Sequence, residues 1–232
     1  MIYDFIFATK ELSKVVYALS ICLICAIIVL KTDRLFKLSD HQGLRYFRNS
    51  FLFYGISFIT RYILGGISNP LNSSYYNQLY LIIINHLSNF FIIVASLFLL
   101  YSLVWKYIDK KKRHRSFLNM QTIIIYLLSF IIVLLNYVLK MNYLFYIFQI
   151  LLFTSLTIIS LSNCLDKKQR NKISKYYFLT LFLGLMIWVS HLFAYLYTNL
   201  NSLFNLLIYT TNILFFMSFL ISISKLTNKK NG

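Results

Sequence analysis

Seven long apolar runs, separated by short polar connections, constrain the fold of this chain more than any other feature. A helix that crosses a hydrocarbon core of roughly 30 Å needs about 20 mostly apolar residues, whereas a strand of a membrane barrel alternates over about ten. These runs are continuous, so the sequence predicts an all-α bundle of seven transmembrane helices, in a single membrane domain over residues 1–232. The expected helices cover approximately 12–31, 44–65, 80–105, 121–139, 142–163, 174–197 and 202–224.

The composition agrees with a membrane protein and excludes three other classes. Hydrophobic residues make up 59% of the chain and charged residues 12%, whereas about a quarter of an average soluble domain is charged. A soluble domain of this size has too little interior to bury so much apolar surface, and a disordered chain is far less hydrophobic. Three cysteines are too few for a disulfide-stabilised scaffold.

The positively charged residues predict the orientation of the bundle. Nineteen of the 23 Lys and Arg residues fall at every second connection and in the C-terminal tail, and such residues favour the cytoplasmic side. We therefore expect a multi-pass protein of the cell membrane with its N-terminus outside and its C-terminus in the cytoplasm.

The net charge of +17 predicts contact with anionic lipids of the inner leaflet through the basic loops. No nucleic-acid partner is expected, because the basic runs are short and lie beside membrane ends. The basic segments are 31–48, 106–115, 167–175 and 225–230.

Weak similarity between the two halves of the chain indicates a repeat of three helices. At a fixed offset, Arg45 aligns with Lys175 and Tyr46 with Tyr176. Such a repeat gives two parallel halves in a three-plus-one-plus-three plan, as in several transporter folds, with helix 121–139 as the connector. Low-complexity apolar sequence also aligns with itself, so chance similarity stays open as the alternative.

Polar side chains within the apolar runs gather in the outer halves of the helices and define a candidate site. A polar group in hydrocarbon costs several kcal/mol unless it has a partner. Lipid offers no partner, so the polar helix faces should point into the bundle. Helical spacing places Ser57 on one face with Arg61, and Trp188 on one face with His191. We predict an outward-facing polar pocket with the ligand-binding candidates Arg61, His86, Asn89, Gln149, Trp188, His191 and Asn212.

Arg61 indicates the chemistry of the ligand. All six acidic residues lie in connections or near helix ends, so none is available inside the apolar runs. A cation without a carboxylate partner favours an anionic guest, such as a carboxylate or phosphate group. The alternative is that Arg61 extends to the headgroups of the outer leaflet. The expected ligand is a small polar or anionic molecule or a lipid headgroup.

His86 and His191 leave several roles open. Such imidazoles serve as axial haem ligands, as pH-sensitive groups or as hydrogen-bonding partners. The sequence lacks the H-x-x-E and Glu-x-x-His spacings of a metal centre, so we predict no metal and no cofactor. It also lacks the G-x-S-x-G, P-loop and H-E-x-x-H motifs, so we predict no catalytic residues and no enzyme activity.

Two resemblances carry functional expectations. The segment from Gly43 to Gly55, GLRYFRNSFLFYG, resembles a segment of uncharacterised seven-helix membrane proteins of archaea, and some similar modules serve as input domains of sensors. The length, orientation and three-plus-one-plus-three plan resemble the SWEET sugar facilitators, which implies facilitated transport of a small solute. The hinge prolines of that family have no counterpart here, since the one proline is Pro70, in an outer connection.

These features favour an integral membrane binding or sensing module over two alternatives. A sensor needs access from one side only, and its basic loops, above all 106–115, would contact a cytoplasmic signalling partner. A facilitative small-solute transporter needs a path through the inner half of the bundle, where the apolar runs hold few polar side chains. A haem protein with His86 and His191 as axial ligands is the third hypothesis.

Overall fold

The structure, a computed structural model, describes residues 2–39, 41–65, 75–108, 120–141, 143–165, 172–197 and 202–228. Within these ranges the chain is helical and contains no strand, so the all-α prediction is confirmed. One short π-helical element, η1, continues α2 without a break. The elements are α1 (Ile2–Ser39), α2 (Gln42–Phe58), η1 (Ile59–Leu64), α4 (Tyr75–Ile108), α5 (Met120–Leu139), α6 (Tyr143–Leu165), α7 (Lys172–Leu196) and α8 (Ser202–Asn228).

The helix ends follow the predicted runs closely except in α1. The predicted run 12–31 falls within a helix that extends from Ile2 to Ser39, so the expectation that Lys31, Arg34 and Lys37 lie in a connection is wrong. Two effects explain the extension. Leu35 is buried against the rest of the bundle, and cations near a helix C-terminus are stabilised by the helix dipole.

Among the described residues, six helices are long and apolar enough to cross a membrane. These segments support a multi-pass membrane protein by length and composition. α2 with η1 is the remaining helical unit, and it carries three arginines. The six segments are Ser13–Leu38, Gln78–Trp105, Met120–Leu139, Tyr143–Leu165, Lys175–Leu196 and Leu206–Lys225.

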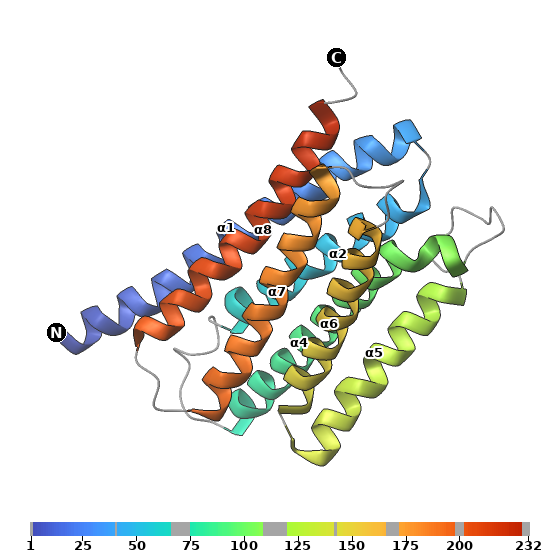
Figure 1. Cartoon of the computed structure of the whole chain (residues 1–232). Coiled ribbons are helices and arrows are strands. Elements are labelled where there is room, and N and C mark those ends of the chain that lie inside the picture. The colour runs from blue at the N-terminus through green and yellow to red at the C-terminus, as the bar shows by residue number, and fades with distance from the viewer. Residues whose placement is uncertain are drawn as a thin grey trace.

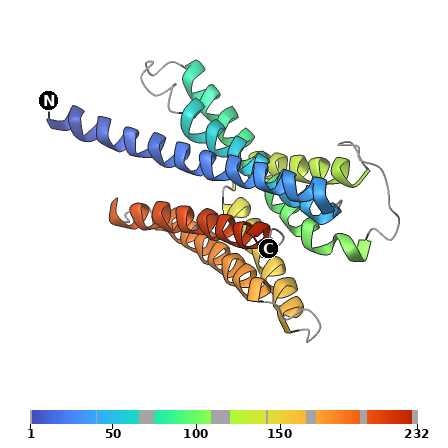
Figure 2. The same cartoon turned by 90° about the horizontal axis from the view of Figure 1, so that it is seen from above.

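The helices form a closed ring in chain order. α1 contacts α2, α2 contacts α4, α4 contacts α6, α6 contacts α7, α7 contacts α8, and α8 contacts α1. α5 lies outside this ring, at the edge of the bundle against α4 and α6 (Figure 1). Figure 2 shows α1 between its two ring neighbours, α2 and α8. Successive helices run in opposite directions, so that α1, α4 and α6 all end on the same side of the bundle as α8 (Figure 1). We call this side the basic end, because the described cations near these helix ends, such as Lys37 of α1 and Lys225 of α8, lie there.

Short hydroxyl side chains and aromatic rings hold the ring of helices together. The Ser57 and Ser88 hydroxyls lie 3.1 Å apart and join α2 to α4, and Ser50 donates a hydrogen bond to the Ala95 carbonyl at 2.7 Å. The interior is filled by phenylalanines, among them Phe51, which is fully buried. Small polar groups allow backbones to approach closely in a membrane, where packing rather than hydrophobicity drives helix association. This packing positions the cavity described next.

Candidate functional site

A small cavity of about 50 Å³ lies inside the ring, toward the end opposite the basic end. Every helix of the ring contributes to its lining, and α5 does not. We call it the arginine cavity. The side chains that matter for its chemistry are Tyr17 of α1, Arg61 of η1, Tyr146 of α6, Trp188 and His191 of α7, and Asn212 of α8.

Arg61 supplies the positive charge of the arginine cavity. It lies in the π-helical segment η1, a rare geometry that occurs mainly at functional sites. Its guanidinium carbon is 5.9 Å from the centre of the Tyr62 ring. Although Arg61 lines the cavity, its side chain is also exposed. A cation that both faces the cavity and remains accessible can meet an anion that enters from outside the bundle.

His191 and Asn212 are further polar side chains in the lining of the arginine cavity. The Asn212 amide donates a hydrogen bond to His191 Nε2 at 3.4 Å, which joins α7 to α8. This contact uses Nε2 as an acceptor, so the neutral imidazole carries its proton on Nδ1. The rings of Trp188 and Tyr146 lie 5.6 Å and 6.5 Å from the His191 ring. The imidazole is therefore packed against two aromatic rings of the cavity lining.

A hydrogen-bonded chain extends from the cavity toward the α4–α6 contact. The Tyr54 hydroxyl, which lines the cavity, is 2.9 Å from Ser96 Oγ, and Ser96 donates to Gln149 Oε1 at 2.8 Å. Gln149 is fully buried, and its Nε2 has no hydrogen-bond partner among the described residues. A buried donor without a partner costs about 1–3 kcal/mol. Gln149 thus supports the cavity from behind rather than lining it.

The structure brings four of the seven sequence candidates into the arginine cavity, places Gln149 behind it, and leaves two elsewhere. Arg61, Trp188, His191 and Asn212 line it. His86 lines a separate groove of about 770 Å³ between α4 and α5, where its ring meets the edge of Tyr137 at 5.2 Å.

Asn89 is half-buried on α4 and lines none of the described cavities. His86 and His191 therefore face different hollows, which does not fit one haem held by both. Within the described part of the chain, no group of three or more metal-binding side chains is present.

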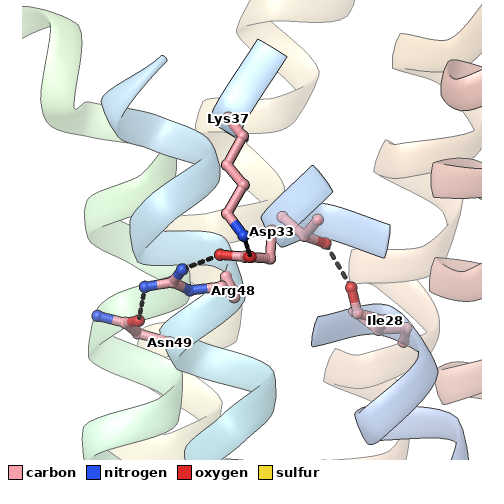
Figure 3. Close-up of polar contacts among 6 residues, drawn as sticks. Ile28, Asp33, Lys37, Arg48 and Asn49 are labelled. Carbon is pink, nitrogen blue, oxygen red and sulfur yellow. Dashed lines mark hydrogen bonds and ion pairs between the residues drawn. The ribbon is translucent and has the colours of Figure 1, made fainter. Parts of the chain in front are cut away.

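The one carboxylate with a described side chain forms ion pairs with cations other than Arg61. Among the acidic residues, only Asp33 has a described side chain. It accepts a hydrogen bond from Arg48 and forms an ion pair of 3.0 Å with Lys37 (Figure 3). Asp33 and Lys37 lie in the last two turns of α1 and Arg48 lies in the first two turns of α2, whereas Arg61 lies in η1, beyond the other end of α2. No carboxylate with a described side chain therefore neutralises Arg61.

The seven candidates chosen from the sequence do not include two features of the cavity. Tyr17 and Tyr62 line it, but the chain holds 19 tyrosines, and residue type alone does not single them out. Gly184 also lines it, and a Cβ at this position would come within 2.5 Å of the Phe153 ring and 2.6 Å of the Phe215 ring. The available signal for Gly184 was its place four residues before Trp188, on the same helical face.

Comparisons with known proteins give no family for the chain: no family model, no curated protein and no solved structure matches it.

Proposed function

We propose that this protein is an integral membrane binding module that takes a small anion into the arginine cavity. The observation that carries the proposal is the position of Arg61, which faces a cavity built from all six ring helices while the described carboxylate pairs with Arg48 and Lys37. A guanidinium with polar neighbours such as His191 and Asn212 recognises a carboxylate or a phosphate through charge-assisted hydrogen bonds.

The proposed topology has seven crossings. We propose that α2 with η1 is the seventh, with the basic end in the cytoplasm and the N-terminus outside, as the distribution of basic residues favours. The order of contacts, with α2 between α1 and α4 and α7 between α6 and α8, supports the three-plus-one-plus-three plan with α5 as the connector. Protease-accessible tags at the two ends of the full chain test this topology, because seven crossings require that the tags be cut from opposite sides.

The size of the cavity limits the ligand. One water molecule needs roughly 10–15 Å³ of such space, so a cavity of about 50 Å³ holds only a few atoms larger than hydrogen. Formate, acetate and inorganic phosphate are suitable probes, and the phosphate of a lipid headgroup is the alternative source of the same chemistry. In the sensing hypothesis, occupancy is transmitted to a cytoplasmic partner or to inner-leaflet lipids at the basic end.

Tryptophan fluorescence tests binding directly. The chain has two tryptophans, Trp188 in the arginine cavity and Trp105 near the basic end beside His41. In the Trp105→Phe variant, Trp188 is the single reporter. Titration of the full chain in nanodiscs of neutral lipid, at constant ionic strength, should give a saturable change with at least one of the three probes.

Two arginine variants provide the contrast. Arg61→Gln should weaken binding by about 10–100-fold, since a hydrogen bond to a charged group contributes about 1.5–3 kcal/mol. Arg34→Gln, a change of an exposed arginine on α1, should leave the affinity unchanged. A signal that appears only with anionic lipid, and that free phosphate does not displace, identifies the headgroup as the ligand. Equal affinities of Arg61→Gln and the unaltered chain would overturn the proposal.

A further inference from the structure

A second hollow lies inside the same ring of helices, at the basic end. It has a volume of about 170 Å³ and is lined from α1, α2, α4, α7 and α8. We call it the basic-end cavity. Its lining is mainly apolar but includes polar groups from four places in the fold, namely Thr32, His41, Ser102 and Ser222. The interior of the ring is therefore hollow at both ends and not only at the arginine cavity.

Phe51 of α2 contacts residues of both cavities. Its side chain is fully buried and lines neither of them. On one side its ring contacts Phe47 at 4.8 Å and Phe219 at 5.0 Å, and both of these line the basic-end cavity. On the other side it contacts Tyr54 at 6.1 Å and Phe216 at 6.0 Å, and both of these line the arginine cavity. Packed aromatic rings thus connect the linings of the two hollows, both through Phe51 and through the contact of Phe215 with Phe219 at 5.0 Å.

We propose that the two cavities are the ends of a passage, and that the anion bound at Arg61 crosses the membrane when the Phe51 ring moves aside. This inference rests on the proposed function, because it takes the same anion and the same binding site. An apolar constriction between wider cavities gates a pore by excluding water until it widens. The activity is facilitated diffusion of a small carboxylate or phosphate down its gradient, and it needs no coupled ion.

Electrostatics favours this passage for anions over cations. Arg61 stands at one end of it. At the other end, Lys31 donates a hydrogen bond to Ser224 at 2.7 Å, and the Lys225 ammonium lies 4.0 Å above the Tyr176 ring. Neither lysine lines the basic-end cavity, but positive charge at both ends of the ring raises the local concentration of anions and lowers that of cations.

Flux through the full chain in vesicles tests the proposal. Radiolabelled formate and phosphate are supplied outside, at a mildly alkaline pH at which formate is ionised, and protein-free vesicles give the background. The unaltered chain should show saturable uptake above background, and Arg61→Gln should reduce it by the factor by which it weakens binding. Phe51→Ala should raise uptake severalfold, because it removes the barrier ring.

The matched control is Phe98→Ala on α4. Phe98 is also fully buried, but it packs against Tyr46, Phe53 and Tyr126 and lines neither cavity. Phe98→Ala removes the same atoms as Phe51→Ala. Because none of these three neighbours lines either cavity, uptake per folded molecule should stay unchanged. If Phe51→Ala does not fold, Phe51→Leu removes less volume and should raise uptake by a smaller factor.

The outcomes separate this inference from the proposed function. Saturable Trp188 titration without uptake above background would overturn the passage and leave anion binding intact. Uptake that Phe51→Leu and Phe98→Ala change equally would show that Phe51 is not the barrier. Absence of both binding and uptake would overturn both proposals.

Discussion

In α2 and α5, the polarity of the sequence and the degree of burial differ in opposite directions. α2 carries Arg45, Arg48 and Asn49, yet it buries ten of its 17 residues. α5 has a nearly unbroken apolar sequence, yet it buries only four of its 20 residues. In a bilayer the surroundings of a protein are themselves apolar, so a helix facing lipid must be apolar all round. High apolarity therefore marks the peripheral helix, and polar side chains mark the one enclosed by protein.

The largest expected difference between the two helices concerns one large side chain on each. Phe47→Ala on α2 should lower the free energy of unfolding by about 3 kcal/mol, the lower end of the range of about 3–5 kcal/mol for such truncations. The lower end is expected because lipid, unlike water, is itself a good solvent for a phenylalanine ring. Phe47 is 8% exposed and packs on Phe51 and Phe219. Phe130→Ala on α5 removes the same atoms from a residue that is 59% exposed, and it should cost less than about 1 kcal/mol.

Unfolding of both variants in mixed micelles, at increasing fractions of denaturing detergent, measures these costs. The unaltered chain provides the reference. Equal losses from the two truncations would contradict the contrast between an enclosed α2 and a peripheral α5.

Much of the fold was predictable because each helix is encoded by a local stretch of sequence. Continuous apolar runs give the helices, and a period of 3.6 residues correctly placed Ser57 with Arg61 and Trp188 with His191 on inward faces. The sequence did not reveal the closure of the ring or the volume of the cavity. Both depend on contacts between helices that are distant in the chain.

His86 illustrates what local periodicity leaves undecided. Ser88 is buried and bonds to Ser57, so this side of α4 faces the ring. His86 precedes Ser88 by two residues, which is about 200° around a helix, so it faces α5 instead. A polar residue in a membrane helix is thus a good candidate for a protein contact, but the sequence alone does not decide which contact.

A smaller difference is expected for two buried serines. Ser57 on α2 bonds across to Ser88 on α4, whereas Ser129 on α5 donates to the Ile125 carbonyl of its own helix at 2.8 Å. Ser57→Ala should cost about 0.6 kcal/mol and at most about 1.7, the range for hydrogen bonds between membrane helices. Ser129→Ala should cost less, because it breaks no contact between helices.

The double variant Ser57→Ala with Ser88→Ala completes this test. If the two serines act through their shared bond, the loss in the double variant is smaller than the sum of the single losses. Strict additivity would show that the contact between these hydroxyls contributes nothing to the packing of α2 on α4.

The smallest effect is expected on the outward face of α5. Leu127 and Ile131 are 58% and 43% exposed, and exchanging their types in the variant Leu127→Ile with Ile131→Leu preserves composition. Lipid chains adapt to either shape, so the free energy of unfolding should change by less than about 0.5 kcal/mol. A protein neighbour does not adapt in this way, because packed side chains interlock in defined rotamers. A loss above about 1 kcal/mol would therefore show that a second protein surface covers this face, and that the apolarity of α5 reflects an interface rather than exposure to lipid.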